Sequence, residues 1–171
     1  MGAEVGKPAP AFTLAGSDNT DEGRRDYSLE DYRGQVVVLV FYPGDSTPVC
    51  TRQLNSYDRD IDQFGELEAQ ILAVSPQGLD SHEGFAEAQG GFAFPLLVDA
   101  DKELAKAYGV LGPVGFYRRS VFVIDGAGVL RYVHRGFAGA TFRKTAELVD
   151  AVRAAALARG ICEKRGSWIS F

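Results

Sequence analysis

The chain has 171 residues, which suits one domain with a single large core and leaves little room for a second. Its net charge is −5 and no block of lysine and arginine stands out, so we expect no nucleic-acid partner. No apolar run approaches the roughly 20 residues that span a bilayer, so we expect no membrane partner. Residues 1–4 show no basic segment followed by an apolar one, so we predict a cytoplasmic protein without a signal peptide.

Strand and helix patterns then alternate along the chain. Residues 16–26 are polar and charged and predict a surface loop. Ser28, followed by an acidic residue three positions later, predicts a short helix start. The continuous apolar, β-branched run at 36–42 predicts a strand that is buried on both faces, as in a parallel sheet. After a short loop, a helical pattern runs from Cys50 to Gly65.

The alternation continues through the second half of the chain. The predicted elements are strands at 70–74, 95–98, 120–124 and 129–134, and helices at 81–89, 102–108 and 141–159. Gly160 is predicted to end the last helix and to leave residues 160–171 as a C-terminal tail. This order predicts an α/β protein with a mixed central β-sheet flanked by helices, an arrangement that resembles the thioredoxin fold.

The chain contains two cysteines, Cys50 and Cys162, which are too few for a disulfide scaffold. No close cluster of cysteine and histidine suggests zinc. His82 and His134 belong to no motif and are interpreted as ordinary polar residues, so we predict no metal site.

Cys50 lies in the first turn of a predicted helix, directly after the loop that ends a buried strand. Unpaired backbone N–H groups and the helix dipole favour an anion there. A free cysteine has a pKa of about 8.5, and a helix N-terminus with a nearby cation can lower it and so expose the nucleophilic thiolate. A disulfide reductase would need a second cysteine three residues earlier, where Thr47 stands. The threonine hydroxyl instead suits holding a peroxide oxygen beside a thiolate.

The segment from Pro43 to Cys50 matches the P-x-x-x-T-x-x-C signature of the peroxiredoxins. Residues 6–14 resemble the family's opening G-x-x-A-P-x-F-x-L, and residues 94–99 resemble its F-P-L-L-x-D segment. Residues 119–125 resemble its R-x-[ST]-F-x-I-D segment, with valine where serine or threonine is usual. The similarity extends over roughly residues 5–155. The motif residues and the chain length are most similar to those of the Q-type (bacterioferritin-comigratory-protein) branch or the AhpE-like branch.

The resemblance implies a thiol-dependent peroxidase that reduces hydrogen peroxide and organic hydroperoxides through a sulfenic acid at Cys50. Thr47 would hydrogen-bond the thiolate and the peroxide. Arg119 would favour the thiolate and stabilise charge on the leaving oxygen. Pro43 would shape the loop and shield the sulfur from water, and Gln53 would have a supporting role. The sulfur carries the redox change, so no metal, haem or flavin is expected.

The recycling step stays open at this point. Common Q-type enzymes have a resolving cysteine five residues after the peroxidatic one, where this chain has Asn55. Cys162 either resolves the sulfenic acid, as a tail cysteine of a partner subunit does in a homodimer, or takes no part. In the second case thioredoxin or a similar thiol reduces Cys50 directly. The alternative function is a peroxide sensor or redox relay that acts through a protein partner.

Overall fold

The computed structural model describes residues 3–18, 23–136 and 142–168, and the side chains among these as far as residue 157. The described strands are β1 (Thr13–Ser17), β2 (Arg24–Ser28), β3 (Val36–Phe41), β4 (Ala69–Ser75), β5 (Leu96–Val98), β6 (Ser120–Ile124) and β7 (Leu130–Arg135). The described helices are η1 (Leu29–Tyr32), α1 (Pro48–Arg59), α2 (Ile61–Gly65), α3 (Leu79–Ala88), α4 (Glu103–Tyr108) and α5 (Thr145–Trp168).

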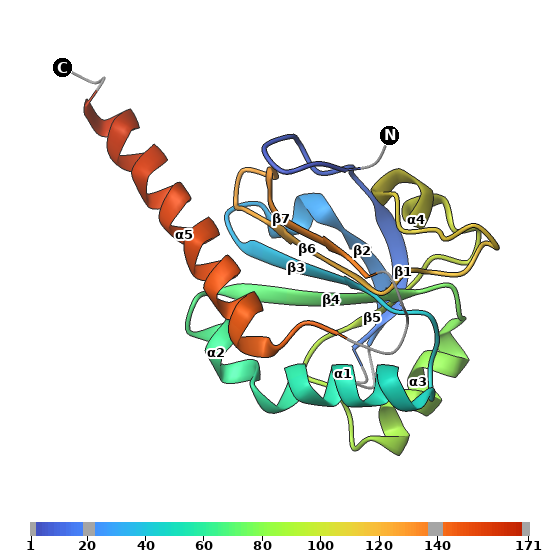
Figure 1. Cartoon of the computed structure of the whole chain (residues 1–171). Helices are drawn as coiled ribbons and strands as arrows, with labels where there is room; N and C mark the ends of the chain where they lie inside the picture. Colours follow the sequence, from blue (N-terminus) through green and yellow to red (C-terminus); the bar gives the residue numbers. More distant parts are fainter. Residues whose placement is uncertain (1–2, 19–22, 137–141, 169–171) are drawn as a thin grey trace.

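These strands form one sheet in the order β2-β1-β5-β4-β3-β6-β7. β3, β4 and β5 run parallel to one another, and β6 lies antiparallel to β3 on its other side. Helices α1, α2 and α3 cover one face of the sheet, and α4 lies on the opposite side (Figure 1). The predicted mixed sheet flanked by helices is therefore confirmed.

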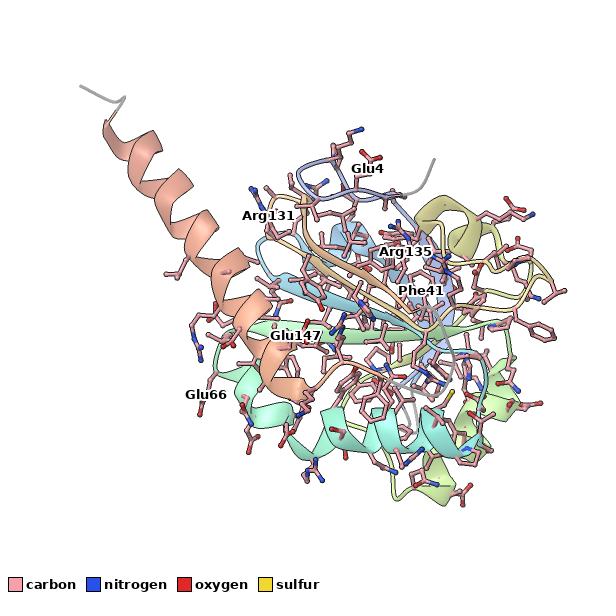
Figure 2. All side chains as sticks on the ribbon, viewed as in Figure 1. Glu4, Phe41, Glu66, Arg131, Arg135 and Glu147 are labelled. Carbon is pink, nitrogen blue, oxygen red and sulfur yellow. The ribbon has the colours of Figure 1, made fainter. Side chains whose placement is uncertain are left out.

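The central strand β3 is buried along its whole length because both faces of the sheet are covered. Val38 and Val40 face the core under α1 and α5, while Leu39 and Phe41 face the core on the α4 side. Phe41 lies deep among the side chains of the molecule (Figure 2). Burial of each such side chain stabilises the fold by about 1.5–3 kcal/mol. The end of β3 is therefore held in place where the next loop begins.

The prediction of a surface loop at residues 16–26 is wrong at both ends of that range. β1 includes Gly16 and Ser17, and β2 begins at Arg24. β2 forms the edge of the sheet, and its residues 24–26 are exposed. Charged side chains are common on edge strands because they discourage pairing with other chains, so a charged segment here is compatible with a strand.

Two predicted helices also differ in their ends. The pattern at 50–65 forms two helices that meet at Asp60, and the last helix begins at Thr145. α5 does not end at Gly160 but continues to Trp168, so most of the predicted tail is helical. A glycine inside a helix costs about 1 kcal/mol, which good helix formers on either side can offset. The last turns of α5 extend away from the sheet (Figure 1). None of the helices in the described ranges combines the length and apolar character needed to cross a membrane.

Candidate active site

The loop between β3 and α1, residues 42–47, is called the motif loop here. Thr47 is the N-cap of α1 with an extended backbone, and Pro48 follows at a first-turn position that suits proline. Cys50 is therefore the third residue of the helix, and it is fully buried. The side chain of Thr47 does not cap the helix, and the N-terminus of α1 favours negative charge near Cys50.

Arg119 reaches the same sulfur from the neighbouring strand. β6 pairs antiparallel with β3 so that Ser120 lies opposite Phe41, which places Arg119 beside the motif loop. The guanidinium Nη1 donates to Sγ of Cys50 at 3.2 Å. Arg119 is only 4% exposed, so this charge acts on the sulfur with little screening by water.

Gln53 holds the guanidinium from the other side, one helical turn after Cys50. Its Oε1 accepts a 2.6 Å bond from Arg119 Nη1, and its Nε2 donates to the hydroxyl of Tyr57 at 3.1 Å. Burial raises the pKa of Tyr57 to about 12, so its phenol stays neutral. Arg119 Nη1 is thus held between the sulfur of Cys50 and a neutral amide.

Gly136, directly after β7, supports Arg119 through the backbone. Its N–H donates to the carbonyl oxygen of Arg119 at 2.8 Å. A Cβ at this position would lie 2.5 Å from that oxygen, closer than real Cβ atoms approach. Only glycine fits here without displacing Arg119. Sequence reasoning missed this residue because no local motif marks a contact between β7 and the start of β6.

Thr47 and Pro43 lie in the motif loop, and in the described part of the chain no hydrogen bond joins either of them to the sulfur. Thr47 is exposed, and its hydroxyl donates to the carbonyl oxygen of Gly44 at 3.2 Å. Pro43 is half-buried at the start of the motif loop. Their assigned roles toward a peroxide therefore stay predictions.

A second buried cluster lies on the far side of the motif loop. Asp45 accepts bonds from the Tyr42 hydroxyl at 2.7 Å and the Ser81 hydroxyl at 2.8 Å. Its Oδ2 is also 2.7 Å from Nδ1 of His82, and Nε2 of His82 is 2.8 Å from the carbonyl oxygen of Leu97. The interpretation of His82 as an ordinary polar residue is wrong, because it is fully buried and its ring contacts Asp45 and Leu97. The ring lies 37 positions from Asp45, so no sequence spacing could reveal this pair.

The second cysteine cannot be placed against the first. Cys162 falls within α5, but its side chain lies outside the described residues. Asn55, at the position of the Q-type resolving cysteine, donates instead to Oε1 of Gln89 at 2.8 Å. Among the residues the structure describes, no three cysteine, histidine or acidic side chains gather closely enough to hold a metal ion.

The mixed sheet, the free cysteine at the start of α1 and the guanidinium beside it define a thioredoxin-fold protein with a buried thiol next to a cation. The sequence profile of the AhpC/TSA family matches residues 5–133. The chain belongs to this family, the peroxiredoxins.

Individual relatives agree with that membership. The chain is 35% identical over 135 residues to a "putative peroxiredoxin in rubredoxin operon" of Clostridium pasteurianum, covering 75% of this chain and 76% of the relative. It is 36% identical over 140 residues to a "thioredoxin peroxidase" of Echinococcus granulosus, covering 78% and 72%. The reduced 2-Cys peroxiredoxin of Plasmodium vivax superposes with a TM-score of 0.81 at 28% identity, covering 88% and 80%.

These comparisons confirm the predicted thioredoxin-like fold and the prediction of a thiol-dependent peroxidase. They do not favour the sensor alternative, because these relatives bear the names of peroxide-reducing enzymes. They do not separate the Q-type or AhpE-like branch from the others, so the branch remains a prediction.

Proposed function

We propose that Cys50 is the thiol that reduces hydroperoxides in this chain. The observation that carries the proposal is the 3.2 Å bond from Arg119 to Sγ, made inside the protein at the N-terminus of a helix. The thiolate attacks the terminal peroxide oxygen and the O–O bond breaks. Sulfur is oxidised to a sulfenic acid, and the leaving oxygen takes a proton to give water or an alcohol.

The surrounding residues supply binding and charge stabilisation. Arg119 favours the thiolate and then stabilises the negative charge on the leaving oxygen. The Thr47 hydroxyl has lone pairs that can accept the peroxide O–H while it still donates to Gly44. Pro43 shapes the motif loop and keeps water from the sulfur, and Gln53 orients the guanidinium.

Recycling requires two thiols in all. We propose that thioredoxin or a similar dithiol reduces the sulfenic acid, a role supported by the name of the Echinococcus relative. The sulfenic acid first condenses with a thiol to form a disulfide and water, and a second thiol then reduces that disulfide. The first thiol belongs either to Cys162, in a two-cysteine cycle, or to the external reductant.

The broader setting is also proposed. We propose that residues 1–171 act as one domain, which the continuous seven-stranded sheet supports. We propose a homodimer that acts in the cytoplasm without nucleic-acid or membrane partners. A reducing compartment suits a catalytic cysteine that is kept as a free thiol.

Intact mass under non-reducing conditions tests the proposal. The protein is treated with one equivalent of hydrogen peroxide, with and without a sulfenic-acid trap. A trapped oxygen on Cys50 is expected if the cycle uses one cysteine, and a bridge to Cys162 if it uses two. The Cys162→Ser variant should still form the trapped product, whereas Cys50→Ser should form none. An unmodified wild-type protein would overturn the proposed function.

A further inference from the structure

The cluster at Asp45 and His82 contains a proton that the bond geometry requires. The carbonyl oxygen of Leu97 can only accept, so Nε2 of His82 must carry a hydrogen. Nδ1 faces a carboxylate oxygen of Asp45 at 2.7 Å, and an ionised carboxylate also can only accept. A second hydrogen must therefore lie between them. The pair holds one proton more than a neutral imidazole beside an ionised carboxylate.

Burial makes this proton necessary for the local structure. The side chains of His82 and Asp45 are 0% and 2% exposed. With the proton in place, the pair is an imidazolium against a carboxylate and has no net charge. Without it, a buried negative charge would face a nitrogen lone pair, an arrangement that proteins do not sustain at such depth.

The other groups around the pair favour the ionised form of the carboxylate. Burial alone would raise the pKa of Asp45, but hydrogen bonds from His82, Tyr42 and Ser81 hold it below its ordinary value of 3.8. Burial and the charge of Asp45 raise the pKa of Tyr42 well above its ordinary range, so its phenol stays protonated and donates. The carboxylate of Asp45 is therefore the acceptor of these three bonds.

The same bonds hold the motif loop in place. The carboxylate of Asp45 ties the loop directly to α3, through Ser81 and His82. Through His82 it also ties the loop to β5, because the ring contacts the carbonyl oxygen of Leu97. The backbone N–H of Asp45 adds a bond to Oε1 of Gln77. Three residues after Asp45 the loop becomes α1, whose first turn carries Cys50.

We propose that Asp45 and His82 are positioning residues for Cys50, and that the proton they share keeps the motif loop in the arrangement that presents the thiol to Arg119. The proposal rests on the proposed function only where it concerns peroxide reduction. The pair in which Nδ1 and Nε2 of His82 both donate is the form that holds the loop.

Other titratable and charged groups near the pair come from three elements. Tyr42 follows β3 and donates to Asp45, and the thiol of Cys50 in α1 interacts electrostatically with Tyr42. On α3, Asp80 and Glu83 are engaged with Arg24 of β2 at the surface. Asp80 and Glu83 therefore do not compete with Asp45 for Nδ1 of His82.

NMR of the imidazole nitrogens tests the proton directly and does not depend on peroxide chemistry. In the full-length Cys162→Ser protein near neutral pH, both ring nitrogens of His82 are expected to show the signature of attached hydrogens. In the Asp45→Asn variant, the amide can donate to Nδ1, so His82 should become a neutral ring with hydrogen on Nε2 alone. A neutral His82 ring in the protein that keeps Asp45 would overturn the proposal.

The second experiment measures what the proton does for the thiol. The rate of Cys50 oxidation by hydrogen peroxide is divided by the thiolate fraction, which is read from ultraviolet absorbance. This rate per thiolate is compared between the protein that keeps Asp45 and the Asp45→Asn variant. It should be about tenfold lower in the variant, because small misplacements of a reacting group are costly. Equal rates per thiolate would overturn the positioning role and leave the proposed peroxidase intact, whereas no peroxide reaction in either protein would count against the peroxidase itself.

Discussion

The motif loop separates two buried polar groups that use charge differently. On one side, Arg119 donates to the sulfur of Cys50 and to the neutral amide of Gln53. On the other side, His82 faces the carboxylate of Asp45, which also accepts from two hydroxyl groups. The second group sets an imidazole against a carboxylate. The first sets a guanidinium against a sulfur and an amide.

This difference separates reactivity from geometry. A cation whose best partner is an ionised sulfur favours that ionised state and so promotes chemistry. A salt bridge whose partners are already satisfied contributes mainly a fixed arrangement of the backbone. Changes on the Arg119 side should therefore alter the rate strongly. Changes on the Asp45 side should alter the stability and pH response of the loop.

The largest effect is expected for Arg119→Ala. Removal of the charge should slow oxidation of Cys50 by hydrogen peroxide about a hundredfold, because both the thiolate and the leaving oxygen lose their stabilising donor. Arg119→Lys should recover part of the loss, since it restores the charge without the planar fork. Stopped-flow measurements of the two variants against wild type provide the check. A change below about threefold in Arg119→Ala would remove Arg119 from the mechanism.

A smaller effect should follow from Gly136→Ala, which displaces Arg119 through its backbone. The added Cβ must push the carbonyl of Arg119 away from its position, so we expect about a thirtyfold lower rate. Gly65→Ala is the matched control, because a Cβ there meets no atom within 4 Å and its φ angle is not positive. Equal rates for the two variants would mean that the Gly136 contact does not position Arg119.

Gln53→Glu should place a carboxylate beside Arg119, as the carboxylate of Asp45 lies beside His82. A carboxylate at the position of the amide would lie about 2.6 Å from Arg119 Nη1 and would compete with the thiolate for the charge. The rate near neutral pH should fall about tenfold, and the thiolate should form at higher pH. Iodoacetamide alkylation of Cys50 as a function of pH measures the shift. An unchanged alkylation profile would show that the neutrality of Gln53 has no role.

The smallest effect concerns the acid stability of the Asp45 side. Because the folded pKa of Asp45 lies below 3.8, its stabilising contribution is complete above that value and is lost as the pH falls through the lower, folded pKa. Asp45→Asn should therefore lack about 1 kcal/mol of this acid-sensitive free energy of unfolding. Urea unfolding of both proteins at several acidic pH values provides the measurement. Parallel curves for both proteins would contradict the assignment.

The parts of the site that could be predicted from sequence are those with local patterns. The apolar run of β3 and the helical pattern after Cys50 predicted the strand, the loop and the position of Cys50 in the first turn. The motif at 119–125 predicted which arginine belongs to the site, and the structure brings Arg119 to the sulfur. Each of these depends on neighbours within a few positions along the chain.

The parts that could not be predicted depend on distant packing. His82 meets Asp45 because α3 crosses from β4 to β5, and Gly136 meets Arg119 because β6 and β7 pair as a hairpin. Neither contact leaves a periodic or spaced signal. Charged residues hid the edge strand β2, and a single glycine suggested an end to α5 that the surrounding helix formers overrode.

The order of elements along the chain also sets the time at which the thiol meets its guanidinium during synthesis. Cys50 precedes Arg119 by 69 residues, and the two meet only after β6 has paired with β3. A ribosome adds about 5–20 residues each second, so the nascent cysteine waits several seconds without its guanidinium. The order of the elements thus postpones the contact between the thiol and its guanidinium until most of the fold has been made.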